Sequence, residues 1–337
     1  MKKLLSFLLV GAMLILVAAA CGEEEEAAEG TATAPATGTP AATVAPTGTT
    51  AAAGYPLTLK DMMGRSVTIA AKPQRVVATS PTTVETVYAV EGTLVAREAT
   101  SDYPPAVADL PTVGKAMAPD FEGIVAQNPD LVIADAINQA RFVQQFEALQ
   151  VPVLMVGAAS FDDVETAMRL VGQALGLSEN AEQAISALEE DRDAVIAQVP
   201  QQTVKTLILV MDADRRIYAA KPETYVGSLA QLLKAENPAA GLSGAAGPYP
   251  GYVLLSAEQA VMENPDVILT ISPAPSPAPQ LSDTLKDVPG YSDLDAVKTG
   301  NVHELDVKLF LQAPGPRVVE AMSQMLPLLY GAVVEED

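Results

Sequence analysis

The chain has 337 residues, of which 49% are hydrophobic, so it is long enough for two ordinary domains with well-filled cores. Its formal net charge of −22 at pH 7 argues against binding to nucleic acid and against adsorption to anionic lipid. Its one cysteine excludes an internal disulfide, and its one histidine argues against a zinc or manganese site and against a Ser-His-Asp hydrolase.

The N-terminus predicts a lipoprotein signal peptide over residues 1–20. Lys2 and Lys3 precede an apolar run that is too short to span a bilayer comfortably. Three alanines then lead to Cys21, and VAAAC resembles the bacterial lipobox, in which the cysteine is acylated. The alternative is an unmodified thiol, either inside a signal peptide or beside a membrane anchor that is never cleaved. We therefore expect an extracytoplasmic protein, lipid-anchored to the cell membrane through Cys21, in a periplasm or at a cell surface.

Residues 21–54 predict a disordered tether. They contain mostly Glu, Ala, Thr, Gly and Pro, and so cannot bury enough apolar surface to offset the entropy of ordering. A flexible coil of this length reaches roughly 30 Å, which lets a tethered domain move beside a membrane protein.

An α/β N-terminal lobe is predicted over residues 55–177. It opens with two alternating stretches around a Met-Gly turn, typical of a hairpin over 55–70. Apolar runs of four to six residues follow, each succeeded by a loop and a helical pattern, which indicates a parallel sheet covered on both faces. The predicted strands are 75–80, 94–99, 130–135 and 152–157.

One connecting helix is predicted over residues 178–200. Ser178 and Asn180 are candidate N-caps, apolar residues recur at helical spacing, and Pro200 marks the end. At 1.5 Å per residue it extends about 30 Å, enough to join two lobes. The same strand rhythm returns in a C-terminal lobe over 201–334, with predicted strands at 204–211, 266–271 and 301–306.

Two segments make the lobes look related. PDFEGIVAQNPDLVIA (119–134) and LSAEQAVMENPDVILT (255–270) align without a gap, and each predicts a helix followed by a buried strand. Glu122 and Glu258 lie near the two helix N-termini, where the helix dipole favours a carboxylate. Helix stabilisation alone explains either glutamate, but it does not explain their shared register.

The order and spacing of several stretches resemble the class III periplasmic-binding family, whose members capture ferric siderophores, haem or cobalamin for ABC importers. The likeness covers about residues 56–330. The matching stretches are PQRVVATSPTTVET (73–86), SDYPP (101–105), FEGIVAQNPDLVIA (121–134), ALGLSENAEQAISAL (174–188), LSAEQAVMENPDVIL (255–269), LDAVKTGNVHELD (294–306) and PGPRVVEAM (314–322).

The resemblance implies a non-enzymatic binding protein with two Rossmann-like lobes joined by one long helix, and a ligand at the lobe interface. It implies no resident cofactor and no protein-ligated metal. The expected partners are a small-molecule metal chelate and an ABC permease dimer with its ATPase; the protein itself is expected to be a monomer. In this family, acidic residues at the positions of Glu122 and Glu258 dock on arginines of the two permease subunits.

Ligands of α/β proteins gather beyond the carboxyl ends of strands, so the loops there are where we expect the ligand site. By family position, three tyrosines (103, 218 and 252) fall where the cobalamin-binding relative has binding aromatics; packing is the alternative for each. The predicted ligand-binding residues are Thr82, Thr83, Tyr103, Asp135, Tyr218, Lys221, Tyr225, Tyr252, Lys308 and Arg317.

The identity of the ligand stays open. The chain has no tryptophan, and Ala116 and Asp135 stand where the cobalamin-binding relative has aromatic residues. Gln312 and Ala313 precede PGPR, where many relatives place an arginine for an anionic ligand. For Arg317, an ion pair with an acidic neighbour is the alternative to ligand contact. A ferric siderophore is the first expectation, with cobalamin or haem next.

A second function is compatible with the same fold: a surface-anchored sensory or adhesion module that signals to another membrane protein. Charge reversal at Glu122 and Glu258 separates the two hypotheses, because only the importer-coupled function requires them for uptake. His303 falls in the predicted edge strand NVHEL, where a surface or half-buried residue is expected and a metal ligand is not.

Overall fold

The computed structural model describes residues 54–212, 214–244, 249–273 and 277–331. The chain divides into the units 1–49 and 50–337, and all described residues belong to the second. The predicted signal peptide, Cys21 and all but the last residue of the predicted tether lie outside the described residues. Among the helices described, none combines the length and the hydropathy needed to cross a bilayer.

The N-terminal lobe is built on a parallel three-stranded sheet in the order β3-β6-β7, and every residue of these strands is buried. Its strands are β1 (Leu57–Lys60), β2 (Ser66–Ile69), β3 (Val76–Ala78), β4 (Gly114–Lys115), β5 (Ala118–Pro119), β6 (Leu131–Asp135) and β7 (Val153–Val156). Its helices are α1 (Pro81–Ala89), α2 (Phe121–Ala126), α3 (Val143–Glu147) and α4 (Phe161–Leu175), with 3-10 turns at Pro105–Val107 and Ala140–Phe142. The predicted hairpin over 55–70 is confirmed by the antiparallel pair β1-β2.

The C-terminal lobe contains a five-stranded sheet in the order β10-β9-β8-β11-β12. Its strands are β8 (Thr206–Met211), β9 (Ile217–Ala220), β10 (Tyr252–Leu254), β11 (Val267–Ile271) and β12 (Val302–Glu304). Its helices are α6 (Tyr225–Leu232), α7 (Ala257–Glu263), α8 (Leu281–Thr284), α9 (Asp295–Thr299) and α10 (Val318–Tyr330); shorter turns are Pro238–Gly241, Leu285–Asp287, Tyr291–Asp293 and the π-helical turn Lys308–Gln312. Half-buried His303 lies in β12, at the edge of this sheet as predicted.

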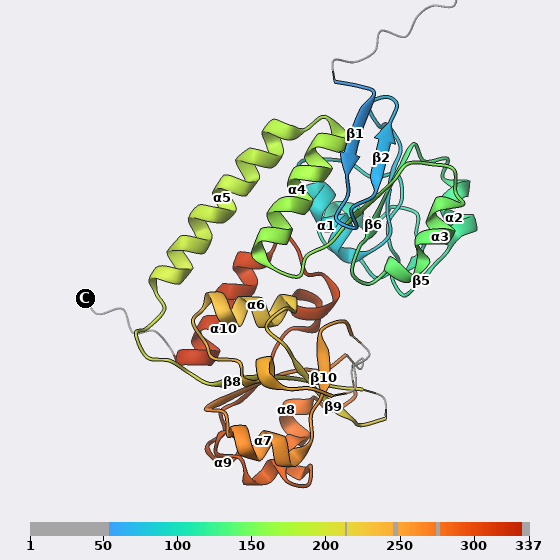
Figure 1. Ribbon diagram of the computed structural model, residues 1–337. Helices are drawn as coiled ribbons and strands as arrows, with labels where there is room; N and C mark the ends of the chain where they lie inside the picture. Colours follow the sequence, from blue (N-terminus) through green and yellow to red (C-terminus); the bar gives the residue numbers. More distant parts are fainter. Residues whose placement is uncertain (1–53, 213, 245–248, 274–276, 332–337) are drawn as a thin grey trace, which may run out of the picture. The chain divides into compact units, whose positions relative to one another are not determined.

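A single long helix, α5 (Ser178–Ala197), links the lobes. It packs against α4 of the first lobe and α10 of the second, along one side of both (Figure 1). The prediction of a capping side chain was wrong: Leu177 is the N-cap and makes no side-chain cap, Ser178 is already helical, and the Asn180 amide contacts Glu91 instead. α4 ends at Gly176 in the left-handed conformation, so the chain reverses directly into α5.

Two predicted features of the sheets were wrong. Residues 94–99 form no strand, because they pair with β3 only through Val77 and Ala96. Beyond this point the Arg97 guanidinium donates hydrogen bonds to the carbonyls of Val107 and Ala108. In the other direction, the loops expected to carry Tyr218 and Tyr252 contain β9 and β10. These short strands pair antiparallel with each other, and β9 pairs antiparallel with β8.

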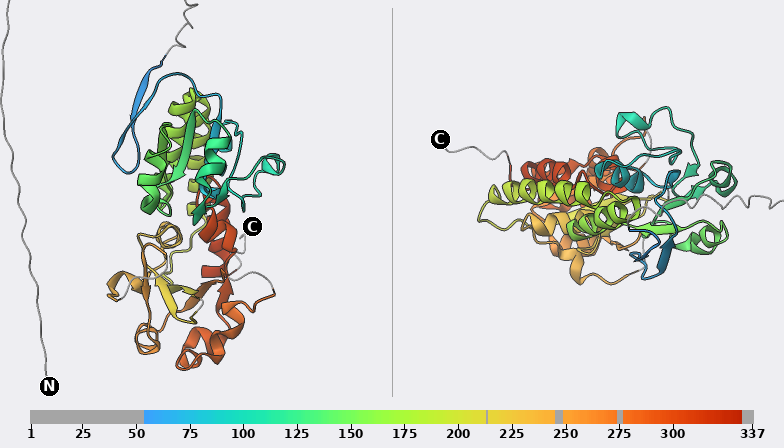
Figure 2. Two further views of the ribbon diagram at one scale, coloured as in Figure 1. Left: turned by 90° about the vertical axis from the view of Figure 1, so that its right-hand side faces the viewer. Right: turned by 90° about the horizontal axis from the view of Figure 1, so that it is seen from above.

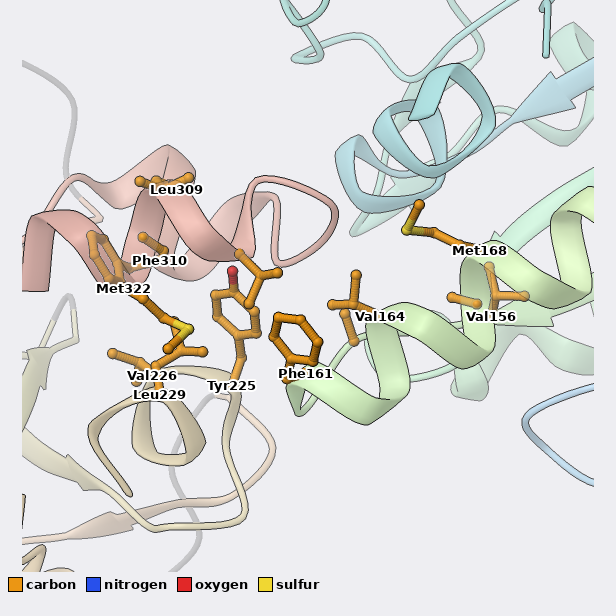
Figure 3. Packing of buried hydrophobic residues seen from close by; sticks show 14 of the residues in the cluster. Val156, Phe161, Val164, Met168, Tyr225, Val226, Leu229, Leu309, Phe310 and Met322 are labelled. Carbon is orange, nitrogen blue, oxygen red and sulfur yellow. The ribbon is translucent and has the colours of Figure 1, made fainter. Parts of the chain in front are cut away.

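The largest hydrophobic cluster runs through both lobes without a break. Figure 3 shows Phe161 from α4 facing Tyr225 from α6, with Val164 on one side and Met322 of α10 on the other. Figure 2 gives two further views of the lobes that this cluster joins. Because a large apolar interface resists relative motion, the cluster predicts lobes that move little against each other.

Candidate functional site

Two adjoining hollows lie where the lobes meet. The first has a volume of ≈ 270 Å³ and is lined from the N-terminal lobe by Thr82, Asp135, Ile137, Asn138, Ala158 and Ala159, and from the C-terminal lobe by Glu223–Val226, Tyr249–Tyr252, Phe310, Leu311 and Pro314. The second, also ≈ 270 Å³, is lined by Pro81, Glu98, Thr100, Lys115, Ala116, Met117 and Asn138, and by Tyr249, Pro273, Leu311 and Gln312. Asn138, Tyr249 and Leu311 belong to both, so the hollows share walls.

Part of the lining comes from segments that follow parallel strands. Thr82 follows β3, Asp135 ends β6, and Ala158 follows β7; in the other lobe Pro273 follows β11 and Leu311 follows β12. The carboxyl ends of the strands of both sheets therefore supply the site, as the general rule for α/β folds predicts.

The wall at the end of β6 is held by hydrogen bonds inside the lobe. The buried Asp135 carboxylate accepts from the backbone N–H groups of Ile137 and Asn138 at 2.8 and 3.0 Å, and from the Asn138 amide at 3.1 Å. The fully buried Gln139 amide ties this turn to Thr79 at the end of β3, and donates to the Ala116 carbonyl at 3.0 Å. Asp135 and Asn138 are therefore presented to the hollow on a fixed turn.

The opposite wall depends on two glycines. Thr224 caps α6 by accepting from the Gly227 N–H at 3.1 Å, and the Lys221 N–H donates to the Gly251 carbonyl at 3.1 Å. A side chain on Gly227 would collide with the Lys221 carbonyl. Gly251 has φ +80°, and a Cβ there would lie 2.6 Å from the Thr224 methyl. Only glycine lets these segments approach so closely.

Three tyrosines give the first hollow its aromatic character. Tyr249 and Tyr252 pack edge to face with ring centroids 5.7 Å apart, and Tyr225 comes from the start of α6. Burial raises the pKa of all three phenols, and Tyr249 raises that of Tyr252 further. The phenols are therefore uncharged at neutral pH and present apolar rings with hydroxyl groups that can hydrogen-bond.

The charged groups of the described lining are mainly acidic: Asp135, Glu223 and Glu98, against one lysine, Lys115. The segments 245–248 and 274–276 add no charged residue, because their sequences are AAGP and APS. Burial tends to raise the pKa of Glu223. This effect is outweighed by a hydrogen bond from its own backbone N–H and by the hydrogen bond and charge of Lys221, so the pKa lies below its ordinary value. Glu223 is therefore ionised at neutral pH.

Glu98 is already saturated with donors. Its buried carboxylate accepts from the Thr100 N–H and hydroxyl, the Ser101 hydroxyl at 3.1 Å, and the Ala116 N–H at 3.2 Å. Within the described ranges there is no group of three or more His, Cys, Asp and Glu side chains arranged to hold a metal ion.

Of the ten predicted ligand-binding residues, the structure brings four into the first hollow: Thr82, Asp135, Tyr225 and Tyr252. Lys221 lies just outside and pairs with Glu223 at 3.1 Å. Thr83 is fully buried, and its hydroxyl completes the cap of α1 with Ser80. Tyr218 is buried in β9, where its hydroxyl donates to Asp212 at 3.1 Å.

The last three of the ten form contacts between the lobes. Arg317, at the start of α10, donates two hydrogen bonds of 2.7 and 2.9 Å to the Glu85 carboxylate of α1, which is the ion pair considered as its alternative role. The Tyr103 ring lies 4.6 Å from the centre of the same guanidinium. Lys308 pairs with Asp102. None of the three is among the described residues that line either hollow.

Several lining residues were not predicted from the sequence. Tyr249, which belongs to both hollows, follows the Gly-rich run 241–247 rather than a strand, so no strand rule pointed to it. Asn138 and Glu223 were not among the ten predicted ligand-binding residues. The signal for Glu223 was available, since KPET (221–224) precedes a capped helix.

The two predicted docking glutamates are exposed and occupy equivalent places. Glu122 lies in the first turn of α2, which is capped by Asp120, and Glu258 in the first turn of α7, which is capped by Ser256. Each helix is followed by a buried parallel strand, β6 or β11, which confirms the predicted helix-strand repeat.

Curated relatives cover most of the chain. It is 26% identical over 84% of its length to the "Uncharacterized ABC transporter substrate-binding lipoprotein YvrC" of Bacillus subtilis, covering 88% of that protein. It is likewise 26% identical over 84% of its length to a "Cobalamin-binding protein" of Halobacterium salinarum, covering 76% of that protein.

The solved structures that resemble this one include the haem-binding protein RhuT of Roseiflexus, at 25% identity and TM-score 0.66, covering 77% of this chain and 99% of that one. An ABC transporter substrate-binding protein of Listeria monocytogenes has TM-score 0.68 at 24% identity, with the same coverage, and shows the fold. The family model described as "Periplasmic binding protein" matches residues 76–309. A match over more than half of the chain, together with the two α/β lobes linked by one helix, establishes that the chain belongs to the periplasmic binding protein family.

Proposed function

We propose that this protein captures an uncharged or cationic metal chelate between its lobes and delivers it to the permease dimer and ATPase of an ABC importer. The observation that carries this proposal is the pair of adjoining hollows, lined by the carboxyl ends of strands from both lobes. Family membership and the relatives named for substrate binding and cobalamin binding support it.

The size of the site favours one ligand in both hollows. Each ≈ 270 Å³ hollow is slightly below the range of about 300–1,000 Å³ that is usual for small-molecule sites. Because Asn138, Tyr249 and Leu311 border both, one larger ligand can extend past these side chains from one hollow into the other. We propose Thr82, Asp135, Tyr225 and Tyr252 as ligand contacts, and add Asn138, Glu223 and Tyr249.

The charge of the lining narrows the ligand class. A trianionic ferric catecholate, or haem with its two propionates, requires cations in the site. The described lining supplies Lys115 alone, while Lys221 and Arg317 are occupied by Glu223 and Glu85. The Glu223–Lys221 pair carries no net charge, and together with the apolar tyrosine rings it suits an uncharged or positively charged chelate, such as a ferric hydroxamate or a corrinoid.

Delivery would depend on the N-terminal cysteine and on one exposed glutamate in each lobe. Export and acylation at Cys21 would place the protein outside the cytoplasm and anchor it to the cell membrane. Glu122 and Glu258 would dock on the two permease subunits, since two equivalent acidic contacts suit a two-fold partner. We propose that the protein works as a monomer in this complex.

The test is a thermal-shift panel with ferrioxamine B, cyanocobalamin, haemin and ferric enterobactin. A ligand at 100 times its dissociation constant adds about 2.7 kcal/mol, or roughly 5 °C in a protein of this size. We expect cationic ferrioxamine B or neutral cyanocobalamin to raise the midpoint. A shift with ferric enterobactin or haemin alone would overturn the charge argument, and no shift with any of the four would count against chelate binding.

A further inference from the structure

The related helices α2 and α7 share a valine as well as a glutamate. Val125 follows Glu122 by three residues, and Val261 follows Glu258 by three residues. Residues three apart lie on one face of a helix, so each lobe presents a carboxylate with a valine beside it. Both valines are exposed, with 51% and 45% of their surface accessible to solvent, and the neighbouring Met262 is 80% exposed.

Exposed large apolar side chains are otherwise scattered over the described surface. The seven are Met63, Tyr103, Met117, Val125, Leu254, Val261 and Met262. Three of them lie in α2 and α7, which together have only thirteen residues, six in one and seven in the other. A single exposed apolar residue needs no explanation, but the same placement in both lobes does. The local fold does not require it, because both valines face solvent.

On the N-terminal lobe the valine borders a shallow, largely apolar hollow. Phe121, Glu122, Val125 and Ala126 of α2 line it, together with Ala148 and Leu149 beside α3. On the C-terminal lobe, Val261 and Met262 project from α7 next to Glu258. A hydrogen bond from its own backbone N–H and one from Ser256 lower the pKa of Glu258, so the carboxylate is ionised.

We propose that Val125 with its hollow and Val261 with Met262 form the apolar half of a docking surface for the two-subunit permease. The partner that fits is a two-fold membrane protein offering, in each subunit, a cationic side chain flanked by an apolar one. The cation complements Glu122 or Glu258, and the apolar group covers the valine. This inference rests on the proposed function and extends it from two charges to two mixed patches.

The apolar contacts have a different role from the charges. Exposed charge pairs mainly set orientation and the rate of association. Burying the exposed half of each valine side chain adds apolar contact, which mainly slows dissociation. The hollow on one lobe and the projecting Met262 on the other make the two patches unequal, so the two subunits of a symmetric dimer would make different apolar contacts.

The test uses photo-crosslinking in cells that carry the full-length lipoprotein and its importer. p-Benzoylphenylalanine replaces Val125, Val261 or, as a control, Met63, an exposed residue in the β1-β2 turn. We expect positions 125 and 261 to capture the same multi-span permease polypeptide, identified by mass spectrometry, and position 63 to capture none. No product, different polypeptides at the two positions, or equal capture at Met63 would overturn the proposal.

A second measurement separates this inference from the proposed function. The double variant Val125→Asn/Val261→Asn should bind ferrioxamine B or cyanocobalamin as the wild type does, yet lose roughly tenfold or more in affinity for the permease complex in nanodiscs. If the double variant and the wild type bind the permease complex equally well, the apolar contacts are disproved and the proposed function is unaffected. If the wild type binds the permease but no chelate, the ligand proposal fails. If the wild type does not bind the permease, importer coupling fails.

Discussion

At the scale of single residues, the Arg317–Glu85 pair adds a largely buried ion pair to the apolar contacts between the lobes. The Glu85 side chain is only 4% exposed and that of Arg317 19%. Removing one partner of a buried ion pair lowers the free energy of unfolding by about 3–5 kcal/mol. Because Arg317 is partly exposed, we expect Arg317→Met to lie near the lower end of this range. Urea unfolding should therefore show a loss of about 3 kcal/mol. The double variant Glu85→Leu/Arg317→Met should recover most of it; equal losses in both would contradict this account.

The same pair predicts a pH dependence. Burial raises the pKa of Glu85 above its ordinary value of 4.5, although the hydrogen bond and the charge of Arg317 pull it down, and the pair raises the pKa of Arg317. The pKa of Glu85 is therefore higher in the folded than in the unfolded protein. Its contribution to the free energy of unfolding is fully present below the unfolded-state pKa and is lost as the pH rises through the folded-state pKa. Without Arg317 this loss is larger. The stability difference between wild type and Arg317→Met should therefore widen as the pH rises above about 4.5 in urea titrations; a constant difference would disprove it.

Residue-scale prediction from sequence succeeded where the side chain follows a parallel strand directly. Asp135 ends β6 and lines the first hollow, as expected. Tyr218 did not reach the site, because it lies in the antiparallel strand β9, whose existence the sequence did not reveal. For Arg317, only the packed lobes show that Glu85, more than two hundred residues away, is its partner.

At the scale of elements, the contact between α4 and α5 requires a small residue. A Cβ on Gly172 would lie 2.5 Å from the Cβ of the fully buried Ala181 and 3.1 Å from the Leu177 carbonyl. Alanine has the better helix propensity by up to about 1 kcal/mol, but overpacking costs about 1–3 kcal/mol. Gly172→Ala should therefore lower the free energy of unfolding, and Gly172→Ala/Ala181→Gly should restore much of it. Gly241→Ala, where a Cβ meets open space, is the matched control; a neutral Gly172→Ala would refute the close contact.

Most elements could be predicted because their signals are local. Buried parallel strands appear as short apolar runs, and α5 as a long helical pattern ended before Pro200. The two strands β9 and β10 were missed because they have three or four residues each and gain their partners only in the folded sheet. The run 94–99 shows the reverse, since in the folded protein it makes only isolated pairings, through Ala96 and Arg97, and is not a strand.

At the scale of the whole binding unit, the continuous core between the lobes predicts little closure. Phe161, Tyr225 and Met322 would have to separate for a wide opening, which would expose buried aromatic surface. The radius of gyration of residues 54–337 from small-angle scattering should therefore be the same, within error, with and without a saturating chelate. A clear contraction on binding would contradict a rigid arrangement of the lobes.

The central claim is that the chelate binds between the lobes, and an equilibrium titration of tyrosine fluorescence tests it most directly. The chain has nine tyrosines and no tryptophan, so ferrioxamine B or cyanocobalamin bound beside Tyr249 and Tyr252 should quench a signal free of indole background. Tyr249→Ala should weaken binding roughly tenfold or more, since a lost aromatic contact of about 1.4 kcal/mol is a factor of ten. Tyr103→Ala, outside both hollows, should leave the affinity nearly unchanged. If Tyr249→Ala binds as tightly as the wild type, or if Tyr103→Ala is the weaker variant, the ligand lies elsewhere and the account is wrong.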